Sequence, residues 1–199
     1  ISKFIRPGTV VATGTSGLSI NSLGLSFETE VRKSFLGIHM FNPPYNMTLC
    51  EVIPTEFTNK DLLIDIKKYL TEKLKRKVVE VKDQPAFLGN RIGFQFLNEA
   101  LQLSEKYKQR GGIDYIDSII GPFTGRSMAP LVTANFVGLD VHKAIVDNIY
   151  ENTQDYANKT FIFPTYSQKL VLENRLGAKT GSGLYKNIRE DNGSTIKYV

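Results

Sequence analysis

Residues Gly37 to Pro44 have the sequence Gly-Ile-His-Met-Phe-Asn-Pro-Pro, and this stretch organises the interpretation of the chain. One of only two histidines, His39, closes its apolar run, which has the length of a strand. Asn42 and the two prolines cannot easily continue a strand, so they predict a turn or loop. The next apolar run carries Glu51 in its middle. Two neighbouring strands joined by this loop would bring the imidazole and the carboxylate together.

Such a pair has a definite chemical use. A carboxylate that accepts a hydrogen bond from one imidazole nitrogen fixes the ring tautomer and stabilises the imidazolium form. The other nitrogen of His39 is then free to take a proton from a substrate. The residues alone also allow the more common case, a hydrogen-bonded histidine of the core.

Composition indicates an ordinary globular protein. Of the 199 residues, 41% are hydrophobic and 23% are charged, which argues against a disordered or collagen-like chain. No apolar run is long enough to span a bilayer, so we expect no membrane span. The N-terminal residues lack the layout of a signal peptide and do not start with Met, so we expect a segment cut from a longer polypeptide.

The net charge and the cysteine content indicate which binding partners and which cellular location to expect. The net charge of +5 is modest and no nucleic-acid-binding motif is present, so we expect no nucleic-acid partner. A basic surface suits a polyanionic small molecule such as a nucleotide cofactor. The single cysteine, Cys50, excludes an internal disulfide and suits a reducing, cytoplasmic location.

Two halves differ in their patterns. The first 82 residues mix strand and helix signals, and the next hundred are dominated by helical ones. Thr58 and Asp61 have capping-box spacing ahead of apolar residues at helical intervals, and Asp140 is placed to cap a later helix. We expect strands over 9–13, 35–41, 48–53 and 77–82, and helices over 18–27, 58–74, 87–108, 113–120, 139–150 and 167–176.

Several well-known motifs are absent. The chain has no G-x-G-x-x-G dinucleotide turn, and residues 177–183 do not have P-loop spacing. No paired-histidine pattern is present, so no metal site is expected. His142 lies in an expected helix without a neighbour that supports catalysis, and we interpret it as a structural residue.

Asn90 falls near the start of the long helix expected from residue 87. Helix N-termini carry unpaired N–H groups and a partial positive charge. An amide side chain there could hold a polarised carbonyl oxygen. The alternative, an asparagine at a helix start without a ligand, stays open.

Five segments together resemble the L-3-hydroxyacyl-CoA dehydrogenase family. They follow the family's order and cover the chain from about Gly8 to Lys186, with the pattern closest to bacterial multifunctional enzymes that also carry an enoyl-CoA hydratase. The H-x-F-N-P core followed by the glutamate is the most specific part. The segments are ATGTSGLSI (12–20), GIHMFNPP (37–44) with CEVI (50–53), DQPAFLGNRI (83–92), VGLDVHKAIVDN (137–148) and GAKTGSGLYK (177–186).

The resemblance implies a fold. It predicts an α/β remnant of a Rossmann-type NAD domain followed by an all-α 3-hydroxyacyl-CoA dehydrogenase C-terminal domain. We expect boundaries at 1–82 for the end of the NAD domain, 83–187 for the helical substrate and dimerisation domain, and 188–199 for a polar tail or linker. The family's glycine-rich half of the NAD domain is missing here, so we expect the chain to be inactive alone. A homodimer through the helical domain is implied.

The resemblance also implies an activity, the NAD-dependent oxidation of (S)-3-hydroxyacyl-CoA to 3-oxoacyl-CoA in fatty-acid β-oxidation. His39 matches the family's catalytic base and Glu51 its partner. Ser16 matches a serine that contacts the substrate's 3-oxygen close to the nicotinamide, although glycines replace more usual polar residues around it. Asn90 matches an asparagine that contacts substrate near the reacting carbons.

Two further residues match positions that approach NAD, namely Asn42 and Lys179. An alternative from another class is a non-catalytic module for acyl-CoA binding or dimerisation, which would not need a base such as His39. An unrelated dehydrogenase of the 6-phosphogluconate type would explain the helical half but not the His39 stretch.

Overall fold

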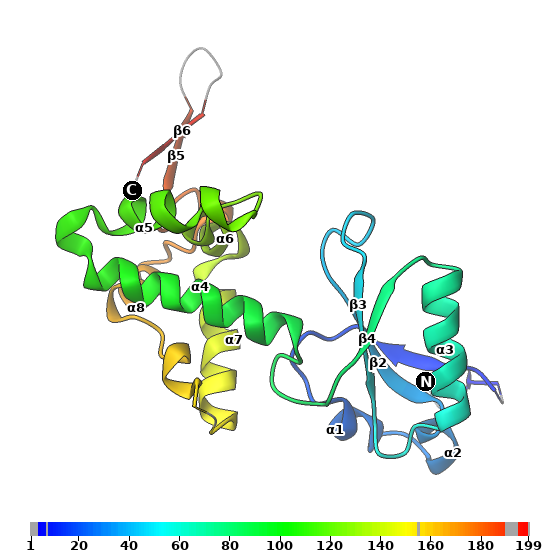
Figure 1. Ribbon diagram of the computed structural model, residues 1–199. Coiled ribbons are helices and arrows are strands. Elements are labelled where there is room, and N and C mark those ends of the chain that lie inside the picture. The colour runs from blue at the N-terminus through cyan, green and yellow to red at the C-terminus, as the bar shows by residue number, and fades with distance from the viewer. Residues whose placement is uncertain (1–3, 7, 155, 190–194, 199) are drawn as a thin grey trace. The chain divides into compact units, whose positions relative to one another are not determined.

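The computed structural model describes residues 4–6, 8–154, 156–189 and 195–198, and Figure 1 labels their helices and strands. Contacts between residues divide the chain into two compact units, Ile1–Arg91 and Ile92–Val199. Family resemblance placed the domain boundary slightly earlier, after residue 82.

A four-stranded sheet forms the centre of the first unit. Its order is β1 (Val11–Thr13), β2 (Phe35–Met40), β3 (Leu49–Pro54) and β4 (Lys77–Glu80). Strands β1 and β2 are parallel, β2 and β3 are antiparallel, and β3 and β4 are parallel. The central pair is therefore a hairpin-like unit joined by the loop that the prolines predicted.

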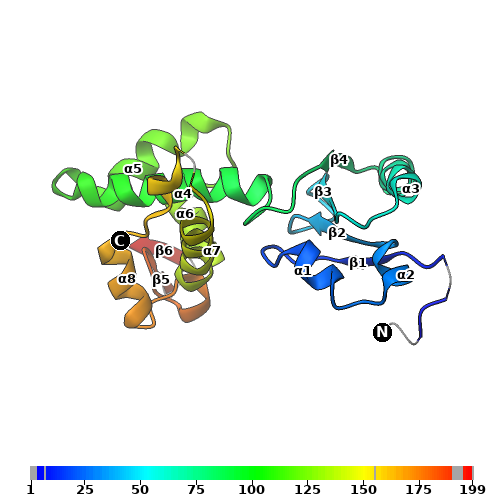
Figure 2. The ribbon, with the colours of Figure 1, turned by 90° about the horizontal axis from the view of Figure 1, so that it is seen from below.

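Helices cover both faces of this sheet. Figure 2 shows α3 (Lys60–Glu72) on one side, and α1 (Ile20–Gly24) with α2 (Thr29–Arg32) on the other. Because successive strand residues point to opposite faces, each strand contributes to two cores. On the α1 side the buried residues are Ile20, Phe35, Ile53 and Phe87, and on the α3 side they are Leu36, Cys50, Val52 and Leu70.

The same alternation orients the two residues of interest. In the β2–β3 register His39 lies directly opposite Glu51. Every second residue of a strand points to the same face of the sheet. His39 therefore shares a face with Phe35 in β2, and Glu51 shares a face with Ile53 in β3. Since Phe35 and Ile53 belong to the core on the α1 side, both site residues point to that side. Gly37 lies between Phe35 and His39 on this face, where a Cβ would stand 3.0 Å from the Ile20 side chain.

The start of α3 differs from the expectation of a Thr58 cap. The N-cap is Asn59, whose side-chain oxygen accepts hydrogen bonds from the N–H groups of Asp61 and Leu62. The Thr58 hydroxyl instead donates to the Phe35 carbonyl oxygen and accepts from the Thr55 N–H. The Thr58 hydroxyl, which the capping pattern predicted to bind the start of α3, thus forms hydrogen bonds with other parts of the unit instead.

Helices dominate the second unit. The long helix α4 (Gly89–Lys106) begins two residues later than expected, because Ala86 and Phe87 have positive φ angles of 62° and 52°. Helix α5 packs on α6, α6 on α7, and α7 on α8. The remaining bounds are α5 Gly112–Ile120, α6 Pro130–Val137, α7 Leu139–Asn152 and α8 Thr165–Leu172, with short 3-10 turns at Lys108–Arg110, Pro122–Thr124, Asn158–Phe161 and Ala178–Thr180.

Two details of this unit correct the sequence interpretation. Asp140 does not cap α7, because the helix begins after Gly138 at a φ of 102° and the Asp140 carboxylate pairs with Lys179 instead. The strands β5 (Lys186–Arg189) and β6 (Thr195–Tyr198) also form an antiparallel pair, which lies mostly beyond the helical domain expected over 83–187. The polar tail expected over 188–199 lies partly outside the described residues, and its described part belongs to these strands.

The length and hydropathy of the helices bear on whether one of them could cross a membrane. No helix in the described part of the chain combines the length and the hydropathy that a membrane crossing requires.

Candidate active site

A buried hydrogen bond between a histidine and a carboxylate forms the centre of the candidate site. The Nδ1 atom of His39 lies 2.7 Å from Glu51 Oε2, and the two residues are only 3% and 1% exposed. Because a carboxylate can only accept, Nδ1 carries the hydrogen and Nε2 of the neutral ring is left as an acceptor. The imidazole therefore presents its basic nitrogen away from Glu51.

Backbone amides hold the second oxygen of Glu51. Its Oε1 atom accepts hydrogen bonds from the N–H groups of Leu88, at 3.0 Å, and Gly89, at 2.7 Å. Burial alone would raise the pKa of Glu51, but the hydrogen bonds from His39, Gly89 and Leu88 outweigh it and lower the pKa below its ordinary value. The carboxylate stays ionised and can stabilise a protonated His39.

Ser16 completes the arrangement on the other side of the ring. Its Oγ atom lies 3.1 Å from His39 Nε2. Ser16 is exposed and belongs to the loop between β1 and α1, where Thr15 Oγ1 accepts the N–H of Leu18. A basic nitrogen therefore meets a hydroxyl at an accessible position.

Two aromatic rings fix the plane of the imidazole. The Phe41 ring packs edge-on at a centroid distance of 4.7 Å, and the Phe87 ring lies at 5.5 Å. Phe41 also lies against Gly89, where a Cβ would come within 2.6 Å of the Phe41 ring. Only glycine at position 89 leaves room for this ring.

The other expected site residues are placed less tightly. Asn90 is the second residue of α4 and follows Gly89, whose N–H binds Glu51. Asn42 follows β2 and precedes Pro43 through a cis peptide bond. Lys179 belongs to the second unit, where it donates to Asp140 at 2.7 Å. Hydrogen bonds thus join His39 to Glu51 and to Ser16, and within the described part of the chain they do not include Asn90, Asn42 or Lys179.

Sequence reasoning missed the contributions of Asp83, Phe87 and Gly89. Asp83 accepts hydrogen bonds at the start of α1, close after Ser16 in the chain. All three belong to the DQPAFLG part of a segment that carries the resemblance, which was a usable signal. Nothing in that segment shows which atoms it contacts, because the contacts involve distant residues.

The second histidine has a different setting. His142 is fully buried on α7, and its Nε2 atom lies 3.2 Å from the side-chain oxygen of Asn98. Its Nδ1 atom has no hydrogen-bond partner in the part of the chain that the structure describes. Burial lowers the pKa of His142 to about 4. These observations suit the structural role expected from the sequence.

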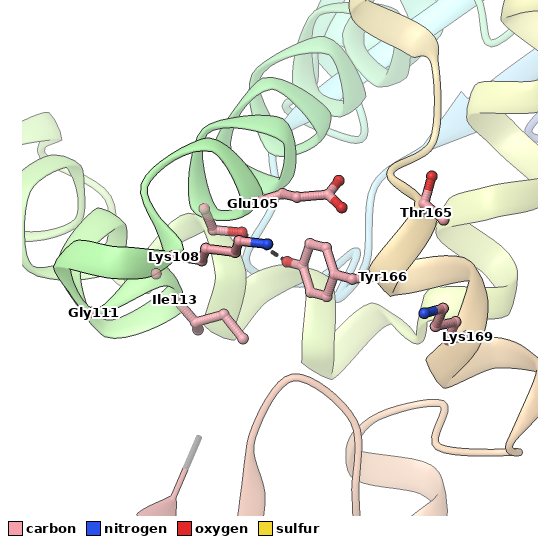
Figure 3. Close-up of a pocket in the computed structure, with 9 residues that line it drawn as sticks. Glu105, Lys108, Gly111, Ile113, Thr165, Tyr166 and Lys169 are labelled. Carbon is pink, nitrogen blue, oxygen red and sulfur yellow. Dashed lines mark hydrogen bonds between the residues drawn. The ribbon is translucent and has the colours of Figure 1, made fainter.

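The second unit holds a cavity of about 500 Å³, which Figure 3 shows. Its wall includes Glu105 near the end of α4, Lys108, and Tyr166 and Lys169 of α8. The Tyr166 hydroxyl is bound to Ser104 Oγ at 2.7 Å. None of the expected site residues lines this cavity, so cavity size does not locate the site here.

The first unit places several of the expected site residues where a nicotinamide dinucleotide would be held. Open parallel sheets bind such cofactors beyond the carboxyl ends of their strands. Ser16 follows the carboxyl end of β1, His39 and Asn42 lie at that end of β2, and a Cβ on Gly17 would meet nothing within 4 Å. The residues present fit the cofactor, and no group of three or more metal-ligating side chains occurs among the described residues.

Two family models match the chain. Residues 1–84 match the family model described as "3-hydroxyacyl-CoA dehydrogenase, NAD binding domain". Residues 87–187 match the model described as "3-hydroxyacyl-CoA dehydrogenase, C-terminal domain".

Individual relatives point the same way. A probable 3-hydroxyacyl-CoA dehydrogenase of Bacillus subtilis is 32% identical over 187 residues, which cover 94% of this chain and 23% of that protein. The human mitochondrial hydroxyacyl-coenzyme A dehydrogenase is 35% identical over 189 residues, covering 94% and 57%. The chain thus spans between about a quarter and just over half the length of these relatives.

A solved structure is also similar. The (S)-3-hydroxybutyryl-CoA dehydrogenase of Ralstonia eutropha superimposes with a TM-score of 0.81 at 26% identity. The superposition covers 93% of this chain and 62% of that one.

Proposed function

Because the chain belongs to the 3-hydroxyacyl-CoA dehydrogenase family, we propose that His39 is the base in the NAD-dependent oxidation of (S)-3-hydroxyacyl-CoA to 3-oxoacyl-CoA. The observation that carries the proposal is the position of the imidazole between the Glu51 carboxylate and the Ser16 hydroxyl. A binding module would not need a basic nitrogen held in this way.

Proton transfer is the task of the imidazole. His39 Nε2 accepts the proton of the substrate's 3-hydroxyl, whose O–H bond breaks as the carbonyl forms. NAD, when bound, supplies the acceptor for the hydride that leaves C3. In the reverse direction the imidazolium returns the proton to the oxygen.

Glu51 makes this transfer easier by its charge. As His39 becomes positive, the ionised carboxylate 2.7 Å from Nδ1 stabilises it, and the low exposure of both side chains strengthens this interaction. The Leu88 and Gly89 amides keep Glu51 from turning away or taking the proton itself. The Ser16 hydroxyl marks where the substrate oxygen lies and donates to it.

Three further residues complete the proposed site. Asn90 contacts the substrate near its reacting carbons, which its place in the first turn of α4 supports. Asn42 approaches NAD from the carboxyl end of β2. Lys179 is the other residue proposed to contact NAD, and its amino group is available to an anion only if it leaves Asp140.

The wider setting is also a proposal. The reaction serves fatty-acid β-oxidation in the cytoplasm, where the unpaired Cys50 would remain reduced. The protein forms a homodimer through its helical unit, which is supported by exposed aromatic side chains there, Phe123 at 86% and Phe136 at 69%.

The test measures NADH formation by the protein at its natural length. With (S)-3-hydroxyacyl-CoA and NAD we expect turnover, and with the (R) enantiomer none. The 199-residue chain, assayed alone, serves as the comparison. Binding of the acyl-CoA without any NADH would overturn the proposal and favour a non-catalytic module for acyl-CoA binding or dimerisation.

A further inference from the structure

One short connector contacts His39, Glu51 and the segment that follows Ser16. The connector comprises Asp83 to Gly89 and joins β4 to α4 in the first unit. It is separated in sequence from Ser16, His39 and Glu51, yet it contacts the surroundings of each. Different residues of the connector make these three contacts.

The first contact holds the loop that carries Ser16. Asp83 Oδ1 accepts the Ile20 N–H at 3.0 Å. Its Oδ2 accepts the Ser19 hydroxyl at 2.8 Å, the Asn21 N–H at 2.8 Å and the Asn21 side-chain amide at 2.9 Å. Four donors on one carboxylate fix the chain three residues after Ser16. Although burial opposes ionisation, these bonds lower the pKa of Asp83.

The second contact sets the ring plane of His39. Phe87 is buried and its ring lies 5.5 Å from the imidazole. It reaches this place with a φ of 52°, and Ala86 before it has a φ of 62°. Two successive non-glycine residues in the left-handed region are strained, and such strain persists where surrounding contacts impose it.

The third contact fixes the Glu51 carboxylate. The N–H groups of Leu88 and Gly89 both donate to Oε1, which leaves Oε2 facing His39. The left-handed turn at Ala86 and Phe87 directs these two amides towards the sheet. The absence of a Cβ at Gly89 lets the Phe41 ring close over the same place.

We propose that the connector Asp83–Gly89 is a positioning element that aligns Ser16, His39 and Glu51 as one unit. It acts through these residues and does not itself touch the reacting atoms. The inference rests on the proposed dehydrogenase function for its kinetic consequence, but its geometric consequence stands without it.

Two substitutions test the connector at opposite ends, each with a matched control. Gly89→Ala places a methyl group against Phe41, whereas Gly93→Ala on the same helix meets nothing within 4 Å. Asp83→Asn replaces an acceptor by a donor that faces the Ser19–Asn21 segment, whereas Asp65→Asn changes an exposed position on α3.

The kinetic readout separates positioning from binding. We expect Gly89→Ala and Asp83→Asn to lower kcat about 10- to 100-fold with less than about threefold change in KM, because small misplacements cost rate more than binding. Both controls keep the wild-type kcat. A wild-type kcat in both connector variants would overturn the proposal.

A second readout does not depend on turnover. The NMR signal of the His39 Nδ1–H proton reports its hydrogen bond to Glu51. We expect it to shift or broaden in Gly89→Ala and to stay in place in Gly93→Ala, with both proteins folded by circular dichroism. An unmoved signal in Gly89→Ala contradicts the positioning role. If the wild type forms no NADH, the proposed function fails, and the NMR result alone decides on the connector.

Discussion

The two histidines, His39 in the first unit and His142 in the second, are alike in burial and in aromatic neighbours. They differ in their hydrogen-bond partners. Both rings are buried, at 3% and 0% exposure, and both lie among phenylalanine rings. His39 has an ionised carboxylate on one nitrogen and a hydroxyl on the other. His142 has a neutral amide oxygen on one nitrogen.

The partners decide what each ring can do. Asn98 donates both its amide hydrogens to the carbonyl oxygens of Thr160 and Ile162, so its own oxygen must accept from His142. His142 is thereby fixed as a neutral hydrogen-bond donor inside the helical unit. Glu51, in contrast, offsets the charge that His39 would gain with a proton. Burial alone therefore does not distinguish a catalytic histidine from a structural one.

The largest expected effect comes from His39→Gln in the protein at its natural length. Loss of the base should lower kcat by about 10²- to 10⁴-fold, the usual contribution of general base catalysis, with little change in substrate KM. Steady-state NADH formation measures it. A kcat near the wild-type value would remove His39 from the mechanism.

Glu51→Gln should produce a smaller loss, on the order of 10²-fold in kcat. The substituted amide cannot offset a charged imidazolium. Its NH₂ group also faces a donor in either orientation, since Leu88 and Gly89 donate to one oxygen of Glu51 and His39 to the other. The same kinetic assay measures the effect. Glu30→Gln, an exposed change in the same unit, provides the control and should keep full activity.

For His142 the expected effect is on stability and depends on pH. Its folded-state pKa of about 4 lies below the ordinary 6.5, so the folded protein binds the proton less readily than the unfolded chain. The contribution to stability is complete above pH 6.5 and is lost as the pH falls towards 4, to a limit of about 3 kcal/mol.

Urea unfolding of wild type and His142→Gln between pH 7 and pH 4 measures this loss. Glutamine keeps a donor for Asn98 but does not titrate, so the variant should lose less stability in acid than the wild type. Glu51 and Asp83 also have lowered pKa values and destabilise both proteins in acid, so the comparison cancels them. Parallel curves for the two proteins would contradict the structural role of His142.

The smallest effect is expected at the ion pair of Lys179 and Asp140, whose side chains are 43% and 39% exposed. Exposed pairs contribute about 0.2–1 kcal/mol and are screened by salt. Lys179→Met should therefore lower the free energy of unfolding by less than about 1 kcal/mol, and added salt should reduce the difference. A loss of several kcal/mol would mean that this pair holds the unit together.

The approach of His39 to Glu51 could be predicted from the sequence because it is local. Two short strands with a period of two, joined by a loop that contains two prolines, bring neighbouring positions into register. The structural interpretation of His142 was also accessible, since it lies in an expected helix and no motif around it in the sequence supports catalysis. Both conclusions depend on residues close along the chain.

The support around the site could not be predicted, because it comes from long-range contacts of backbone groups. The amides of Leu88 and Gly89 are chemically like those of any residue, and only the fold directs them at Glu51. The same holds for Asp83, which binds a segment far away in the sequence. Side-chain preference also misled at Thr58, whose hydroxyl bonds to β2 and leaves the helix cap to Asn59.

One measurement tests the central claim most directly, which is that His39 serves the reaction and His142 serves the fold. It determines kcat and the free energy of unfolding at neutral pH for His39→Gln and for His142→Ala, each against wild type. We predict that His39→Gln loses at least about 10²-fold in kcat with stability changed by less than about 1.5 kcal/mol. His142→Ala should lose about 2–4 kcal/mol of stability with kcat unchanged while it is folded. A His39→Gln protein with wild-type turnover, or a His142→Ala protein that is stable but inactive, would contradict the account.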